Sequence, residues 1–480
     1  MNIGEILVGR GYVSLEDLAA ARERQKYEAG RLGENLVAMG LLSEEQLASV
    51  LRDTPRSPLN VAETEIPPAN LMNLLLKFMH VEGCELVDDI AGRMRIPNNV
   101  VQELMDEATQ RHFVQSGGAV TRFGQGTSIR HILSERGRAL ALQALNQSLY
   151  VGPVPVSFSA FKAQIVKQPL SHESLSAAAL RATLSDLVIS EDYVEKLLPA
   201  INAGRATLLY GPPGSGKTTI AKRMASLYKD VIYVPFAVDI DGQIVKVFDE
   251  RLHVRAVSTD TAVPGSAKGG LRHGVFDARW VACRRPVTIT GGELSLEMLE
   301  LQYDSDTKFY DAPLHMKALN GVLLIDDFGR QLISPKVLLN RLIVPMENGI
   351  DYLKTKTGKT FPIPFDGTLI FSTNMSPTEL MDHAFLRRIA YKIKFHPPNV
   401  AEFRKIFDAE ARQSGLVLSD EIFNDVVARL TAGGFSLAHF QPRFICEHVV
   451  EACRAFNLPN KMTADLVANA LANLYVELEE

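Results

Sequence analysis

One segment constrains the fold more than any other: a short apolar strand runs into a glycine-rich loop and then into a helix. The strand is ATLLY at 206–210, and the amphipathic helix continues to about Tyr228. The loop between them consists of Gly211, Pro212, Pro213, Gly214, Ser215, Gly216, Lys217, Thr218 and Thr219. This is GxxxxGK[ST] in the context that a phosphate-binding loop requires. The alternating strands and helices of this region predict a parallel α/β sheet.

The residue types of the loop suit the phosphates of a nucleotide. Glycines let backbone N–H groups converge on phosphate oxygens without a Cβ in the way, and the helix N-terminus adds a favourable dipole. We expect the Lys217 ammonium to reach the β- and γ-phosphates and the Thr218 hydroxyl to bind Mg²⁺. The sequence therefore predicts a site for ATP and Mg²⁺.

Two further apolar strands end in polar residues of the kind that such a site needs. Val322–Ile325 is followed by Asp326 and Asp327, and the strand at 368–373 is followed by Asn374. Ligands of open α/β sheets bind where the carboxyl ends of parallel strands meet. We expect Asp326 to hold Mg²⁺ through water and Asp327 to orient or deprotonate the attacking water. Asn374 is expected between the phosphate and the Asp327 carboxylate.

Three arginines are candidates for contacts with the phosphates. Arg387 and Arg388 end a short predicted helix, where a guanidinium either faces solvent or projects into a neighbouring subunit's site as an arginine finger. Arg443 opens a helix in the C-terminal region, which contains amphipathic helices and no strand-like apolar runs.

In this order the motifs resemble those of AAA+ ATPases, from about Ser185 to the C-terminus. The resemblance implies an α/β nucleotide-binding domain at 185–397 and an all-α lid at 398–480. It identifies the loop as Walker A, the two aspartates as Walker B, Asn374 as sensor 1 and Arg443 as sensor 2. It further implies ATP hydrolysis at the interfaces of a homo-oligomeric ring, of six subunits in the family, that remodels or assembles a protein partner.

The chain departs from the family's pattern in two places. Asp327 stands where a glutamate is usual, and the shorter side chain affects the hydrolysis rate more than ATP binding. The stretch Asp239–Ala318 between the second strand and Walker B is unusually long, and its segments Asp241–Asp249 and Gly291–Asp304 are either pore loops or an insertion. A β-hairpin is predicted at Tyr352–Phe365, as in the group of AAA+ proteins that includes the MoxR-like ATPases.

The first 54 residues contain an internal repeat. Gly4, Leu7, Gly11 and Leu18 recur 29 positions later as Gly33, Leu36, Gly40 and Leu47. Each copy is predicted to be a short helix, a glycine turn and a second helix that begins at Ser14 or Ser43 with acidic residues. The prediction is an all-α tandem helical repeat at 1–54.

This repeat resembles the N-terminal domain of type II secretion and type IV pilus assembly ATPases. Some of those domains bind cyclic di-GMP through two copies of RLGxxLxxxG…LxxxLxxQ. Arg31, Leu32 and Gly33 match the start of the second copy. In the first copy Asn2 stands where the motif has arginine, and in the second copy Thr54 stands where the motif has glutamine. Helix packing alone does not predict Gly33, since a helix could use alanine there. Two interpretations stay open: a cyclic di-GMP site in an ATPase linked to secretion or pilus systems, and a protein-docking module.

Residues 55–68 are rich in proline and polar residues and predict a linker. The next segment, 69–150, resembles a winged-helix domain of α+β class. Its predicted elements are helices at Leu71–Val81, Glu85–Met94 and Asn98–Val114, two strands around Ala119–Ile132 with FGQGTS as wing tip, and a helix from Ser134. Residues 151–184 predict a connecting arm to the α/β domain.

The charges of the winged-helix-like segment disfavour nucleic acid. Its predicted recognition helix carries three carboxylates, which would oppose DNA phosphates, although four arginines nearby could form a basic rim. These residues are Glu103, Asp106 and Glu107, and Arg93, Arg95, Arg122 and Arg130. The net charge of −5 adds no global basic field. A protein-interaction role is favoured, and an ATP-switched DNA-binding regulator is the alternative.

No apolar run reaches membrane-spanning length, and the start of the chain lacks the basic and apolar regions of a signal peptide. The expectation is a cytoplasmic protein without a membrane span.

Overall fold

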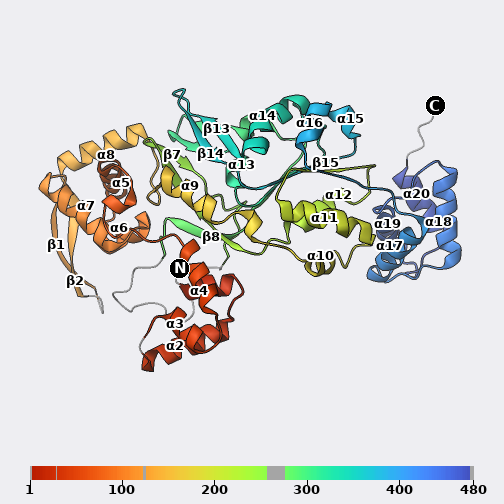
Figure 1. Cartoon of the computed structure of the whole chain (residues 1–480), viewed down its shortest axis with the longest axis horizontal. Helices are drawn as coiled ribbons and strands as arrows, with labels where there is room; N and C mark the ends of the chain where they lie inside the picture. Colours follow the sequence, from red (N-terminus) through yellow and green to blue (C-terminus); the bar gives the residue numbers. More distant parts are fainter. Residues whose placement is uncertain (1–2, 29, 123–125, 257–275, 476–480) are drawn as a thin grey trace.

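A computed structural model describes residues 3–28, 30–122, 126–256 and 276–475 (Figure 1). The predicted parallel sheet is confirmed. Its strand order is β16-β4-β15-β12-β9, and every neighbouring pair is parallel. The strands are β4 (Thr207–Tyr210), β9 (Val287–Thr290), β12 (Val322–Ile325), β15 (Thr368–Thr373) and β16 (Tyr391–Lys394). We call this the P-loop sheet.

Helices cover both faces of the P-loop sheet, which explains why its three central strands, β4, β15 and β12, are largely apolar and buried. Leu324 and its same-face neighbours pack against α10 (Ala177–Thr183), α11 (Glu191–Ala203) and α12 (Lys217–Ala225). Leu323 faces the other way, because successive strand residues point to opposite faces. That second face packs against helices that include α14 (Pro335–Asn348) and α16 (His383–Arg388).

In chain order the second strand of the P-loop sheet is β9. The prediction from the sequence, which placed that strand before Asp239, was wrong. β5 (Val231–Pro235) lies outside that sheet and pairs antiparallel with β8 (Trp280–Arg284). The long stretch before Walker B therefore divides into an insertion at 231–284 and a segment after β9. β5 is a short apolar run, and an apolar run alone does not determine which sheet it joins.

The insertion contributes to a second sheet, of order β10-β11-β7-β6-β3. Its strands are β3 (Val156–Ser157), β6 (Ala237–Ile240), β7 (Gln243–Lys246), β10 (Gln302–Asp304) and β11 (Phe309–Asp311). The predicted hairpin is present beside it as β13 (Ile350–Lys354) and β14 (Thr360–Pro364). Asp241–Asp249 thus belongs to the insertion, and Gly291–Asp304 leads from β9 into the β10–β11 hairpin.

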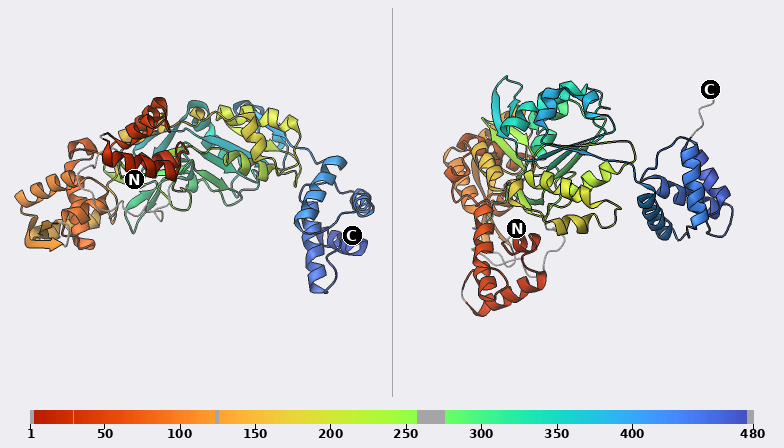
Figure 2. Two further views of the ribbon diagram at one scale, coloured as in Figure 1. Left: turned by 90° about the horizontal axis from the view of Figure 1, so that it is seen from below. Right: turned by 45° about the vertical axis from the view of Figure 1, so that its right-hand side comes forward.

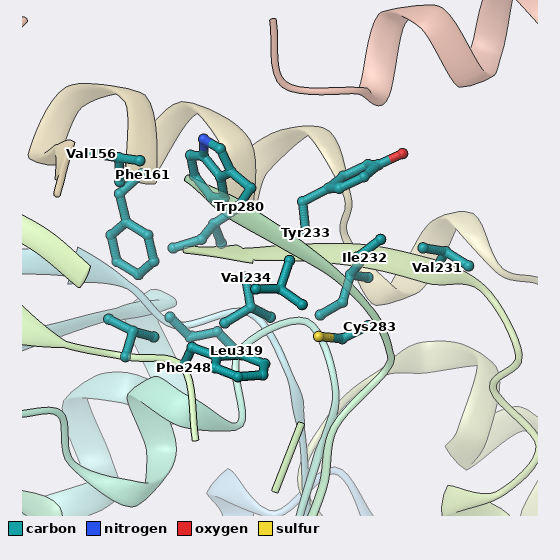
Figure 3. Packing of buried hydrophobic residues seen from close by; sticks show 14 of the residues in the cluster. Val156, Phe161, Val231, Ile232, Tyr233, Val234, Phe248, Trp280, Cys283 and Leu319 are labelled. Carbon is teal, nitrogen blue, oxygen red and sulfur yellow. The ribbon is translucent and has the colours of Figure 1, made fainter. Parts of the chain in front are cut away.

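Residues 151–184 do not form the predicted arm. They contain β3, α9 (Phe158–Lys167) and α10, and α9 packs on the inserted strands. Figure 3 shows Phe161 of α9 in one cluster with Trp280, Val234 and Phe248. The segment 158–167 is a helix that buries one apolar face, and its proline-flanked sequence conceals this pattern.

The predicted linker is also packed. Thr54, Val61, Thr64 and Ile66 are buried, and the carbonyl of Pro55 accepts a hydrogen bond from Asp277 N at 2.9 Å. Proline and polar side chains usually mark a solvated connection, but contacts with the insertion hold this one in place. The described residues of this connection are therefore held against the insertion.

Four helices form the first segment: α1 (Ile3–Gly9), α2 (Leu15–Tyr27), α3 (Leu32–Ala38) and α4 (Glu44–Asp53). The two halves share local geometry. Gly11 and Gly40 both adopt φ of 70°, and Ser14 and Ser43 both cap a helix through a capping box.

The next segment has the element order helix–helix–helix–hairpin–helix. These elements are α5 (Pro68–Val81), α6 (Val87–Met94), α7 (Asn98–Gln110), β1 (Val114–Arg122), β2 (Gly126–Leu133) and α8 (Glu135–Gln147). Of the expected wing tip, Phe123, Gly124 and Gln125 lie outside the described residues.

The C-terminal helices are α17 (Val400–Gln413), α18 (Asp420–Ala432), α19 (Gln441–Ala455) and α20 (Ala464–Leu474), and they share their own apolar core. Figure 2 shows them as a distinct body at one end of the molecule. No helix within the described ranges is both long and apolar enough to cross a membrane.

A buried charge cluster ties the β13–β14 hairpin to α14. Asp351 accepts hydrogen bonds from Arg341 Nη1 at 2.7 Å and Nη2 at 2.9 Å, and its Oδ2 lies 2.6 Å from His315 Nε2. Burial opposes the ionisation of Asp351. The hydrogen bonds from His315 and Arg341 outweigh it and hold the pKa of that carboxyl well below its usual range.

Asp351→Asn is therefore expected to lower the free energy of unfolding by about 3 kcal/mol near pH 7, because Arg341 loses a buried countercharge. The carboxylate's contribution is present above its pKa in the unfolded chain and is lost as the pH falls through the depressed folded pKa. The difference between wild type and variant should thus narrow only below about pH 4. Urea unfolding, followed by the fluorescence of Trp280, the one tryptophan, measures it.

Asp425→Asn is the matched control, because it breaks an exposed pair with Arg429 and should change stability little. An equal loss in the two variants, or a difference between wild type and Asp351→Asn that does not narrow in acid, would contradict the role assigned to Asp351.

Candidate functional site

The carboxyl end of β4 opens into a cavity of about 730 Å³ between the P-loop sheet and the C-terminal helices. The loop that follows β4 forms one wall, and α17 and α19 form the opposite wall. The residues that the sequence predicted and that line the cavity are Pro213, Gly214, Ser215, Gly216, Lys217, Thr218, Thr219, Asp327, Asn374 and Arg443. The cavity is therefore built by segments far apart in the sequence.

Lys217 links the loop to the third strand of the site. Its Nζ donates to the carbonyls of Gly211 at 2.9 Å and Pro212 at 2.8 Å, and to Asn374 Oδ1 at 2.8 Å. Burial lowers the pKa of Lys217, and the nearby carboxylates of Asp326 and Asp327 oppose that shift. Lys217 is buried, and its ammonium is held by neutral partners that phosphate oxygens can replace.

Walker B lies directly beside Walker A. Thr218 Oγ1 donates to Asp326 Oδ1 at 3.0 Å, and Asp327 N donates to the same carboxylate oxygen at 3.0 Å. Asp327 has the left-handed φ of 46°, which turns its side chain away from the line of β12. Its Oδ1 accepts a hydrogen bond from Asn374 Nδ2 at 3.3 Å. Asn374 therefore contacts both the loop lysine and the candidate catalytic carboxylate.

Two glycines of the loop are required by close approach. A Cβ at Gly211 (φ 146°) would lie 2.2 Å from the backbone oxygen of Phe395, and a Cβ at Gly214 (φ 73°) would lie 2.5 Å from the Phe440 ring. The first approach fastens the loop to the strand end of β16. The second fastens it to the C-terminal helices.

Several cavity residues have no local signal that sequence analysis could have used. His439 N donates to the carbonyl of Gly214 at 2.9 Å, so the segment before α19 touches the loop directly. Tyr193 of α11 stacks on Phe395 with ring centroids 4.8 Å apart, and both line the cavity together with Ile189. These contacts arise from packing between distant elements, and no motif marks them.

The three arginines have different surroundings. Arg443 lies at the cavity wall and pairs with Glu447 at 2.7 Å. Arg388 is engaged within its own chain, since its Nε donates to Glu347 Oε1 at 2.6 Å. Arg387 is exposed and has no ion pair within the described part of the chain. Arg387 is the better placed of the two to reach a neighbouring subunit.

The donor set suits Mg²⁺. This ion takes one or two carboxylates with waters and substrate phosphates, and it does not need an all-protein cage. The Thr218 hydroxyl and the Asp326 carboxylate are already adjacent and would hold it on the phosphate side of the loop.

Two positions of the repeat have structural contacts: Gly33, which matches the cyclic di-GMP motif, and Thr54, which stands where that motif has glutamine. A Cβ at Gly33 would lie 2.6 Å from Leu47 Cδ1, so packing between the repeat's helices explains the glycine that an isolated helix would not require. Thr54 Oγ1 donates to Val50 O at 2.6 Å and lies 3.0 Å from the Tyr233 hydroxyl. Thr54 thus serves contact with the insertion. Asn2 lies outside the described residues.

The expected basic rim of the winged-helix-like segment is largely engaged. Arg93 pairs with Glu82 at 3.3 Å, Arg130 Nε donates to Glu85 at 2.6 Å, and Arg95 lies over the Phe236 ring at 4.7 Å. The side chain of Arg122 is outside the described set. The acidic helix has partners too, since Arg111 pairs with Glu107 at 2.6 Å. Three of the four arginines therefore have partners within the chain.

Comparison with known proteins adds little to this geometry. Residues 399–473 match a model described as a domain of unknown function (DUF8689). No curated protein matches the chain in sequence. Among solved structures, the RuvB Holliday junction branch migration motor of Thermotoga maritima is 16% identical with a TM-score of 0.33, over 60% of this chain and 70% of that one. NtrX from Brucella abortus is 12% identical with a TM-score of 0.36, over 73% and 64%.

Proposed function

We propose that this chain is an AAA+-type ATPase that binds and hydrolyses ATP at subunit interfaces and remodels or assembles a protein partner. The observation that carries the proposal is the convergence of Lys217, Thr218, Asp326, Asp327 and Asn374 through direct hydrogen bonds at one sheet edge. The five groups come from three separate strand ends. In the sequence, the order of the motifs was the one indication that they would meet.

The chemistry assigns a task to each group. The loop backbone and Lys217 bind the phosphates, and Thr218 and Asp326 hold Mg²⁺, which neutralises charge on the phosphate oxygens when bound. Asp327 orients the attacking water and accepts its proton, and Asn374 holds the Asp327 carboxylate. Arg443 approaches the nucleotide from the lid, so nucleotide state is coupled to the position of the C-terminal helices.

The site is completed by a second copy of the chain in this proposal. Arg387 projects from the surface of α16, and its guanidinium supplies charge to the γ-phosphate of a neighbour as the arginine finger. The family resemblance implies a homo-oligomeric ring of six subunits, in which this contact would be made. The first 150 residues recruit the partner or sense a signal.

Mixing two inactive variants tests the proposal. Lys217→Met disables the loop, and Arg387→Ala is expected to reduce turnover at least about tenfold, since a charged donor is lost where negative charge develops. If the finger acts between subunits, mixed assemblies regain phosphate release, because one subunit keeps its loop and its neighbour keeps its finger. Arg388→Ala is the control and should act mainly on stability, because Arg388 is bound to Glu347.

No recovery in mixtures whose subunits are shown by light scattering to co-assemble would overturn the shared site. Absence of Mg²⁺-dependent ATP hydrolysis by the wild-type chain at every protein concentration would overturn the ATPase itself.

A further inference from the structure

Three polar residues lie at matching positions at the edge of the P-loop sheet where its strands begin. Arg285, Asn320 and Asp366 each stand two residues before a strand, and the strands are the neighbours β9, β12 and β15. They are at the amino edge, opposite the nucleotide cavity. Asn320 Nδ2 donates to Asp366 Oδ2 at 2.5 Å, Asn320 N donates to Asp366 O at 2.6 Å, and Arg285 Nη1 donates to Asn320 O at 2.8 Å. The starts of all three strands are thereby fastened together.

The same residues bind the end of α9. Asn320 Oδ1 accepts from Gln168 Nε2 at 3.0 Å, and Asn320 Nδ2 also donates to Ile165 O at 3.1 Å. Arg285 donates to the carbonyl of Gln168 at 3.1 Å. Asn320 is 1% exposed and Gln168 8%, so an unmade bond at either amide would be costly.

Gln168 also binds β5, one of the inserted strands. Its Nε2 donates to Tyr233 O at 3.1 Å, and its Oε1 accepts from Tyr233 N at 3.0 Å and from Gln164 Nε2 at 3.1 Å. With the bond to Asn320, both donors and both acceptor positions of this amide are used. A glutamine whose amide is fully bonded is held in one orientation. Gln168 therefore fixes β5 relative to the start of β12.

The far end of the connection is the last turn of α4. Gln164 Nε2 donates to Asp53 O at 2.8 Å, and the Tyr233 hydroxyl, which points away from the other labelled side chains in Figure 3, meets Thr54 Oγ1 at 3.0 Å. A continuous path of buried and part-buried hydrogen bonds therefore runs from the N-terminal repeat, through Gln164 and Gln168, to the starts of β12 and β15.

Resting on the proposed ATPase function, we propose that Gln168 and Asn320 are positioning residues through which the docking of residues 3–54 controls ATP hydrolysis. The ladder between β12 and β15 fixes their register, and in this proposal the hydrogen bonds at the amino edge set the relative tilt of the two strands. Asp327 and Asn374 follow the other ends of these two strands, and their 3.3 Å contact depends on that tilt. The loop and Lys217 belong to β4 and α12, and none of these bonds reaches either element directly, although Lys217 contacts Asn374. Breaking the hydrogen bonds of Gln168 and Asn320 should therefore lower hydrolysis much more than ATP affinity.

Asn320→Gly tests the inference in the full-length chain. Asn320 has the left-handed φ of 57°, which glycine adopts freely, so the variant removes the amide and keeps the backbone. We expect kcat to fall about tenfold or more while the Kd for a fluorescent ATP analogue stays within about threefold. Asn457→Gly is the matched control, since Asn457 also has a left-handed φ, 53°, but is exposed in the C-terminal helices. It should retain wild-type turnover.

Gln164→Leu cuts the path at its outer end and is expected to lower kcat in the same sense. Added to Asn320→Gly it should have little further effect, because the path is already broken. Additive losses, or equal losses of ATP affinity and kcat, would overturn the inference, as would unchanged kcat in a folded Asn320→Gly. Lys217→Met measured in parallel separates the two proposals. If Lys217→Met retains turnover, the proposed nucleotide site is overturned. If only Asn320→Gly retains turnover, the proposed role of Gln168 and Asn320 is overturned.

Discussion

Lys217→Met is expected to abolish ATP hydrolysis and to weaken ATP binding by about 100-fold or more. The ammonium makes charge-assisted hydrogen bonds that are worth about 1.5–3 kcal/mol each, and at least two phosphate oxygens lie within its reach. A loss of about 3 kcal/mol corresponds to two powers of ten in affinity. Methionine keeps the buried aliphatic stem and loses the charge, so the loop itself should persist.

Titration with a fluorescent ATP analogue measures the affinity, and phosphate release measures turnover. Lys222→Met is the matched control, because Lys222 lies on the same helix with an exposed side chain and should leave both quantities unchanged. ATP affinity retained by Lys217→Met within a few-fold would mean that this loop does not hold the phosphates.

Asp327→Asn is expected to reduce kcat by about 1,000-fold while ATP remains bound, since a positioned general base contributes roughly 10²–10⁴. Asparagine has nearly the same shape and can still meet Asn374, but it cannot take a proton from the attacking water. Asp327→Glu keeps a carboxylate and restores the length usual among AAA+ proteins. It should stay within about tenfold of wild type.

Binding of ATP, turnover and the melting temperature should be measured together for both variants. Wild-type turnover in Asp327→Asn would assign the base to another group, and equal losses in both variants would point to packing and not to proton transfer. If the expected split is found, Asp327→Asn loaded with ATP should hold the partner complex long enough for it to be isolated.

The convergence of the candidate site residues was predictable because short sequence motifs identify them. A strand, three glycines, a lysine and a threonine specify an anion-binding turn whatever surrounds them, and an apolar strand that ends in Asp326-Asp327 specifies a sheet edge. The choice between Arg387 and Arg388 was not predictable, since the two are adjacent in sequence. Only the position of Glu347 on α14 distinguishes them.

The errors fell where a segment's role depends on a distant partner. The chain order could not place β5 outside the P-loop sheet, because what an apolar strand pairs with is decided by the whole fold. Gly33 matches a ligand motif and Thr54 departs from it, and neither observation predicted that Gly33 packs against Leu47 or that Thr54 meets Tyr233.

By itself the sequence determined the phosphate loop, the Walker B and sensor strands, and the helical nature of both ends of the chain, since periodicity and motif spacing are properties of short segments. Only the tertiary structure decided that residues 54–67 and 151–184 are packed. It alone also brought Gln168, Asn320 and Asp366 together at the amino edge of the P-loop sheet. Such contacts join residues more than 40 positions apart. Their polar groups are paired because burial makes an unpaired group costly, and that pressure acts only once the chain has folded.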